Sequence, residues 1–170
     1  PPPAPAPAHP ALATPDAAVV TAPPRDVTGD GFRYPIPGSF TELRRPDGAL
    51  AYTGTIAGAL KPATLTVWAT SEPFTGTLAQ LVARETAAAT EAGAPAPDVE
   101  PLDVAIGGKV KPGDARRMTI RLAERIELRA LAVDHGKAYV LHCETPNTRN
   151  ALQNVSADCI ARASAFEIAR

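Results

Sequence analysis

The chain has 170 residues, which is enough for one domain with a hydrophobic core. Its 17 basic and 18 acidic residues give a formal net charge of −1, which argues against a nucleic-acid-binding protein, because such proteins carry a basic excess. No run of 18 or more apolar residues is present, so we expect no segment of the chain to span a membrane.

The N-terminal segment, residues 1–25, is rich in proline and alanine. Residues 1–24 contain nine of the 19 prolines, and such a segment cannot bury enough apolar surface to fold. It favours the extended polyproline II conformation of a spacer. The chain begins without Met, so we expect that a targeting segment has been removed. The composition fits a tether between an exported bacterial domain, residues 26–170, and an anchor. It fits equally a linker between two domains of a longer protein.

The first part of the folded domain reads as strands. Pro35 and Pro37 in "FRYPIPGSF" restrict the residues before them and predict an edge strand or a strand break. Asp47–Gly48 is a hairpin turn signal. The segments "ALAYTGTIA", from residue 49, and "ATLTVWAT", residues 63–70, follow it as strands.

The pattern then changes to a helix, beginning after Thr77. Apolar residues in "TLAQLVARETAAATEAG" recur at helical spacing. Thr77 with Gln80 three residues later forms a capping-box signature at the start. Gly93 predicts the end, and Pro95 and Pro97 prevent the helix from continuing.

The second half of the chain predicts a short strand in the segment that begins at Pro101, then a three-stranded meander, then a helix. The meander strands are expected at 115–123, 126–133 and 137–143, and the helix at 148–163. Runs of strands separated by helices predict an α+β fold, an antiparallel sheet flanked by helices in an α/β/α sandwich.

Both cysteines fall in this last strand and helix. Strand alternation places Cys143 on the same face as Tyr139 and Leu141, and Cys159 lies on the apolar stripe of the helix that covers that face. We therefore predict a disulfide between them, which would close a loop of about 15 residues and contribute about 3 kcal/mol, and which indicates an oxidising compartment.

Two other functions for these cysteines remain open. A metal site would need further ligands, and His142 points to the face opposite Cys143, with no CxxC or HxxxH spacing in the chain. A nucleophilic cysteine would need a base beside one thiol. We expect no metal ligands, no catalytic residues and no cofactor. His142 is interpreted as a half-buried sheet residue, and His135 as a solvated turn residue.

Basic residues gather on the meander. Arg117, Arg121 and Arg129 could share one face of the sheet if the hairpin register is simple. A solvated face balanced by Glu124 and Glu127 is one interpretation, and a docking surface for an acidic partner or anionic headgroups is the other. The members of this group, with neighbouring lysines, are Arg116, Arg117, Arg121, Arg125, Arg129, Lys109 and Lys111.

Trp68 is the only tryptophan and lies on the threonine-lined side of its strand. It packs under a helix or the N-terminal segment, or it lies at a binding surface; both interpretations are open.

Three features together resemble the PsbP-like superfamily, which includes PsbP, Mog, DcrB and Lpq lipoproteins. They are the aromatic–proline segment "YPIPGSF", the glycine turn into "AYVLHC", and the near-terminal "IARASAFEI". The last departs from the common "SF" ending by one inserted alanine. The resemblance covers about residues 30–168. Secreted members often carry a cysteine pair at the last strand and last helix, which matches Cys143 and Cys159.

The resemblance implies binding without chemistry. We expect an exported, non-enzymatic domain that binds or scaffolds a protein partner in the bacterial cell envelope, as a lipoprotein or as a subunit or assembly factor of a larger complex. Membrane association would come only through an N-terminal anchor. Candidate partner-binding residues are Arg117, Arg121, Arg125, Arg129 and Trp68. One alternative is a carrier or sensor of a small amphipathic ligand, bound between sheet and helix near Trp68. Another is an enzyme that uses Cys143 and His142.

Overall fold

The computed structural model describes residues 22–103, 106, 110–111 and 113–169. Within these residues the order of elements is strand-rich, helix, strand-rich, helix, as the sequence predicts. The strands of the first half are β1 (Arg25–Gly29), β2 (Phe32–Ile36), β3 (Thr41–Arg44), β4 (Leu50–Ile56) and β5 (Ala63–Pro73). The remaining elements are α1 (Leu78–Glu91), β6 (Asp98–Pro101), β7 (Arg116–Arg121), β8 (Arg125–Asp134), β9 (Lys137–Pro146), α2 (Ala151–Ala165) and β10 (Glu167–Ile168).

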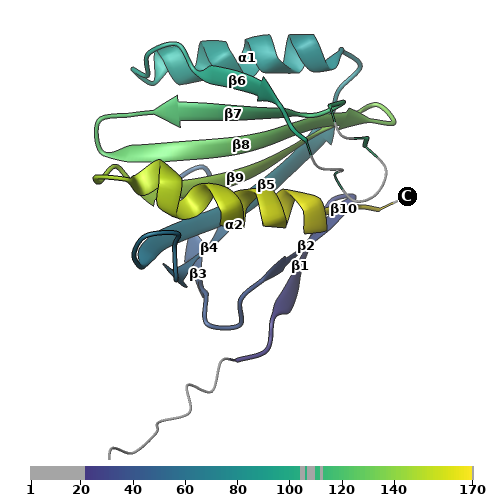
Figure 1. The fold of residues 1–170 in the computed structure, drawn as a ribbon. Helices are drawn as coiled ribbons and strands as arrows, with labels where there is room; N and C mark the ends of the chain where they lie inside the picture. Colours follow the sequence, from purple (N-terminus) through teal and green to yellow (C-terminus); the bar gives the residue numbers. More distant parts are fainter. Residues whose placement is uncertain (1–21, 104–105, 107–109, 112, 170) are drawn as a thin grey trace, which may run out of the picture.

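Seven of the described strands form one antiparallel sheet in the order β3-β4-β5-β9-β8-β7-β6, and the other three form a smaller sheet in the order β1-β2-β10. Helix α2 crosses one face of the large sheet, and α1 lies at the end of the sheet where β6 and β7 run (Figure 1). The α+β fold class is therefore confirmed. No helix among the described residues is long and apolar enough to cross a membrane.

The three-stranded meander of β7, β8 and β9 is set by a short turn. His135 and Gly136 both have positive φ, 47° and 76°, as a two-residue type I′ turn requires. Glycine adopts this conformation without a steric cost. The turn fixes the register between β8 and β9, in which Leu128 is opposite Cys143 and Arg129 is opposite His142.

Helix α1 begins and ends where its sequence signals predict. The Thr77 side chain accepts a hydrogen bond from the Gln80 backbone N–H, and the Gln80 side chain accepts one from the Thr77 N–H. Gly93 follows the helix with φ of 87°. Leu81 and Ala89 bury the apolar side of the helix against Met118, Ile120, Leu131, Ala138 and Val140 of the sheet.

A larger core fills the other face of the sheet, beneath α2 and the small sheet. Phe166, directly after α2, stacks with Phe32 and Tyr34 of β2 at centroid distances of 5.3 and 6.0 Å. Asn154 of α2 is buried, and its side-chain oxygen accepts the backbone N–H groups of Leu60 and Lys61. The helix is thereby fastened to the β4–β5 loop by a polar contact that satisfies buried groups.

Two strands differ from the sequence expectation. β2 is the middle strand of the small sheet, although Pro35 predicts an edge or a break. β2 can be the middle strand and still contain Pro35, because β10 pairs only with Phe32 and Arg33 and the Pro35 carbonyl instead accepts a hydrogen bond from Arg162 Nη1. The short strand expected in the segment from Pro101 lies earlier, as β6, and part of that segment, including Lys109, is outside the described residues.

Candidate functional site

The arginines of the meander lie on both faces of the sheet. Arg117 is opposite Ala130 and lies on the α2 face, together with Arg121. Arg129 is opposite Met118, which packs under α1, so Arg129 lies on the other face. The expectation that Arg117, Arg121 and Arg129 share a face is therefore wrong. The β7–β8 register pairs Arg117 with Ala130 and Arg129 with Met118, so the arginines of the two strands point to opposite faces.

Three arginines of the meander are each paired with a carboxylate. Arg117 pairs with Glu100 and Arg121 with Asp98, both from the adjacent strand β6. The Nε of Arg125 lies 3.3 Å from Glu144 Oε2. A partner that used these arginines would have to displace the carboxylates of these ion pairs, and the role of the group as a docking surface stays a prediction.

Trp68 is buried, with 3% of its surface exposed, on the sheet face opposite α2. Its indole stacks on the imidazole of His142 on the neighbouring strand, with centroids 4.5 Å apart and planes within 8°. The Arg45 guanidinium, from the β3–β4 turn, lies 3.7 Å from the indole centroid. Trp68 is thus buried between Arg45 and His142, whereas the sequence offered a helix or the N-terminal segment as its cover.

His142 continues this stack into a network of charged groups. Its Nδ1 lies 2.6 Å from Glu127 Oε1. Glu127 also accepts hydrogen bonds from the Nε and Nη2 of Arg129, at 2.8 and 3.0 Å. Arg129 Nη1 reaches Glu85 of α1 at 2.6 Å. We call the whole set, which crosses the sheet from the β3–β4 turn to α1, the polar row: Arg45, Trp68, His142, Glu127, Arg129 and Glu85.

The polar row holds its charges in a fixed state. Burial opposes ionisation of Glu127, but hydrogen bonds from His142 and Arg129 and the positive charge of Arg129 outweigh it and lower the pKa of this carboxyl to about 2. Burial is the main cause that lowers the pKa of His142, against the opposing effect of Glu127. We infer a neutral imidazole that donates its Nδ1–H to an ionised Glu127, with Arg129 supplying the compensating charge.

A second carboxylate lies directly across from the polar row. Glu144 on β9 is opposite Glu127 on β8, and two like charges at opposed positions repel. Each is neutralised separately. Glu127 has Arg129, whereas Glu144 lies near Arg45 Nη1, at 3.7 Å, and Arg125. The arginines of this region therefore offset the charges of two carboxylates that lie opposite each other on neighbouring strands.

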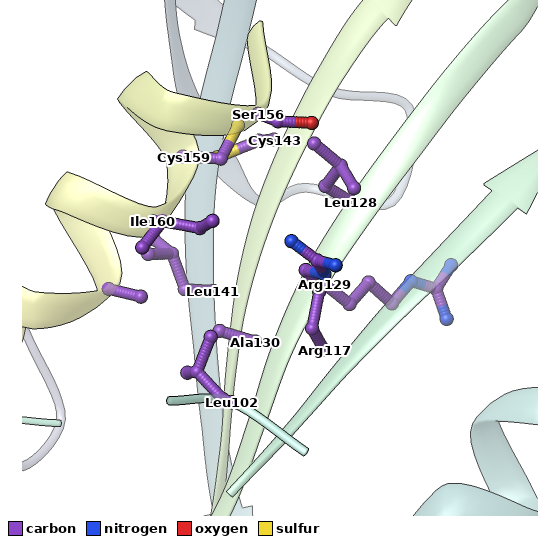
Figure 2. A pocket seen from close by; sticks show the side chains of 11 residues that line it. Leu102, Arg117, Leu128, Arg129, Ala130, Leu141, Cys143, Ser156, Cys159 and Ile160 are labelled. Atoms are coloured by element: carbon purple, nitrogen blue, oxygen red, sulfur yellow. The ribbon is translucent and has the colours of Figure 1, made fainter. Parts of the chain in front are cut away.

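The two cysteines meet on the opposite face, between β9 and α2. Cys143 and Cys159 are both buried thiols in this structure, and Figure 2 shows their sulfur atoms side by side. Burial raises the pKa of the Cys159 thiol well above its usual value. The structure thus brings together the pair that the sequence predicts, with both sulfurs reduced. Among the described residues, no three His, Cys, Asp or Glu side chains converge as metal ligands would.

A small cavity of about 20 Å³ lies beside this pair under α2 (Figure 2). It is lined by Leu128, Leu141, Ser156 and Ile160, among others. The volume suits a single water molecule, whereas ligand pockets measure about 300–1,000 Å³. Trp68 lies on the other face of the sheet. This cavity is therefore not the ligand pocket that the sequence predicts near Trp68.

One half of the sheet face that carries the polar row is open to solvent. α1 packs on β8, and strands β3, β4 and β5 lie at the far end of the sheet from it (Figure 1). The side chains of this half follow from the cross-strand register, in which Thr41 is opposite Thr53 and Thr53 is opposite Thr66. We call this uncharged surface the threonine face; its exposed or half-buried members are Thr41, Leu43, Thr53, Thr55, Thr64 and Thr66.

Sequence reasoning missed Arg45 and Glu85 and took Glu127 for a solvated residue. One signal was present: the two-residue turn at His135–Gly136 places Arg129 opposite His142, and Glu127 lies on the same face as Arg129. Arg45 and Glu85 gave no local signal, because they come from distant segments of the chain.

The fold and these sites define a class of protein. It is an α+β domain with a large antiparallel sheet, helices on both of its faces, and a buried Glu127 that is bonded to His142 and Arg129. Comparison with protein-family models gives no match, and neither does comparison with curated protein sequences.

Solved structures identify this architecture as the PsbP-like fold. The solution structure of cyanobacterial PsbP (CyanoP) from Synechocystis sp. PCC 6803 matches with a TM-score of 0.54 and 12% identity, over 94% of this chain and 99% of that chain. The Ran-binding protein Mog1p of Saccharomyces cerevisiae matches with a TM-score of 0.54 and 15% identity, over 85% of this chain and 95% of that chain. The resemblance drawn from the sequence is confirmed at the level of the fold.

Proposed function

We propose that this chain is an exported, non-enzymatic PsbP-like domain that binds or scaffolds a protein partner in the bacterial cell envelope. The observation that carries the proposal is the threonine face. Protein interfaces are depleted of charge at their centre, and this three-stranded surface combines an exposed Leu43 with hydroxyl groups. A protein with the same fold, Mog1p, is Ran-binding, which supports protein recognition as a task for this fold.

The polar row supports a non-enzymatic role. A general acid or base needs a substrate within hydrogen-bond reach of the group that exchanges the proton. Here the Nδ1 of His142 is engaged by Glu127, and Glu127 is engaged by Arg129 as well. The arrangement stabilises the sheet and fixes the position of Trp68 and Arg45 at the border of the threonine face.

Export is proposed on two features. Residues 1–25 have the composition of a tether, and the Cys143 and Cys159 side chains face each other across the β9–α2 interface, where they would form a disulfide in an oxidising compartment. Both features agree with a domain held outside the cytoplasm, whatever attaches its N-terminal end.

The test is recovery of a partner from envelope extract with the full chain as bait, followed by binding measurements with the purified partner. Thr64→Arg places a charge on the threonine face, and Ala87→Arg places the same charge on the exposed surface of α1. We expect Thr64→Arg to weaken binding at least about tenfold and Ala87→Arg to leave it unchanged. Equal binding by both variants would show that the threonine face is not the docking surface.

A further inference from the structure

The sequence of the edge strand β3 is complementary to a second, antiparallel copy of the same strand. β3 is the last strand of the seven-stranded sheet, and its outer edge has no strand partner among the described residues (Figure 1). All four of its residues are exposed, and Leu43 has 45% of its surface accessible. An open edge of this kind is a template for pairing with another strand.

The main-chain groups that β3 offers can be assigned. The Arg45 N–H donates to the Ala49 carbonyl at 2.9 Å, so the main-chain N–H and C=O groups of Arg45 face β4. In an antiparallel pair, successive residues alternate between bonding to one neighbour and facing the other side. The main-chain groups of Leu43 therefore also face β4, and the N–H and C=O groups of Glu42 and Arg44 face the open edge.

We propose that β3 pairs with β3 of a second copy of this chain in an antiparallel, two-fold arrangement that joins the two large sheets. With Leu43 opposite Leu43 of the second copy, Glu42 is opposite Arg44 of that copy, and Arg44 is opposite its Glu42. The outward main-chain groups of these residues then exchange four hydrogen bonds. The two leucines form the non-hydrogen-bonded pair on the axis, in which side chains lie closest.

The charges distinguish this pairing from edge protection. Charged residues on an edge strand usually prevent association, because a second copy brings like charges together. Here the two-fold operation brings opposite charges together, and each such cross-strand pair stabilises the contact. Glu42 and Arg44 have no ion-pair partner among the described residues, whereas neighbouring Arg45 is engaged by Trp68 and Glu144. The pair is therefore available to a second copy.

The contact is small, so we expect a weak dimer that sedimentation equilibrium detects as the concentration of the full chain rises toward about 1 mM at low salt. Glu42→Arg alone and Arg44→Glu alone each place two like-charge pairs in the homodimer. We expect each to weaken dimerisation at least about tenfold. Glu91→Arg and Arg149→Glu make the same charge changes at exposed sites away from β3 and serve as matched controls.

Two further samples restore the opposite-charge pairs across the dimer and decide the test. An equimolar mixture of the Glu42→Arg and Arg44→Glu variants pairs every charge with its opposite, and so does the double variant with itself. Both should dimerise to within about threefold of the unaltered chain. A chain that stays monomeric at about 1 mM, a dimer that either single reversal leaves unchanged, or a mixture that does not recover would each overturn the proposal.

Discussion

Glu127 is the residue on which the polar row depends most. Its side chain is 5% exposed, and it accepts three hydrogen bonds, one from His142 and two from Arg129. The substitution Glu127→Gln keeps the volume and removes the charge. The new amide nitrogen cannot accept from Arg129, so a buried guanidinium loses part of its neutralisation, and only Glu85 remains to balance it.

Two arguments give the loss in the free energy of unfolding that Glu127→Gln causes. Breaking a buried ion pair by removing one partner costs roughly 3–5 kcal/mol. The pKa of Glu127, lowered from 4.5 to about 2, corresponds to about 3 kcal/mol of stability at neutral pH, since one pKa unit equals about 1.4 kcal/mol. We therefore expect Glu127→Gln to lower the free energy of unfolding by about 3 kcal/mol at pH 7, and Tm by about 6–12 °C.

The pH dependence gives the sharper test. The unfolded chain protonates this carboxyl near pH 4.5 and the folded chain near pH 2, so the unfolded state binds more protons between these values. The stability that Glu127 contributes is complete above about pH 4.5 and is lost as the pH falls toward 2. The difference between the unaltered chain and Glu127→Gln should therefore shrink to about half by pH 3.

Urea unfolding followed by circular dichroism at pH 7, 5, 4 and 3 measures these differences, with Glu91→Gln at the exposed end of α1 as the control. The control should change stability by less than about 0.5 kcal/mol. If Glu127→Gln is as stable as the unaltered chain at pH 7, or if the difference between them does not vary with pH, the inference of an ionised, stabilising Glu127 is refuted.

Two further predictions concern the cysteines and the tryptophan. Protein isolated from an oxidising compartment should contain no free thiol at Cys143 or Cys159 until it is reduced, and reduction should cost about 3 kcal/mol of stability; two reactive thiols in the unfolded, unreduced protein would contradict the disulfide. Arg45→Ala should uncover Trp68, which shifts its fluorescence emission to longer wavelength and increases its quenching by acrylamide. The same substitution should destabilise the fold by about 1–2 kcal/mol. Unchanged quenching would show that Arg45 does not cover the ring.

Local signals account for the elements that the sequence predicted well. Thr77, Gln80 and Gly93 bound α1 because caps and stops act within a few residues of the helix ends. The turn at His135–Gly136 set the β8–β9 register for the same reason, and strand alternation then placed Cys143 and His142 on opposite faces. The PsbP-like fold followed from the order of such elements.

The polar row could not be predicted in the same way. Trp68 meets His142 because β5 pairs with β9, a contact between segments some 70 residues apart that no turn specifies. Glu85 reaches Arg129 only because α1 packs over β8, and Arg45 reaches the indole only because the β3–β4 turn folds over β5. Each contact depends on the strand order of the sheet, which local patterns leave undetermined.

The sequence by itself determined the α+β class, the ends of the first helix, the β8–β9 register and the approach of Cys143 to Cys159, because alternation, helical spacing and turn chemistry are properties of short segments. Only the tertiary structure decided which charges are buried together, that Arg129 lies apart from Arg117, and that β3 forms an open edge. Those outcomes arise from pairing between distant segments, where burial makes every charge find a partner.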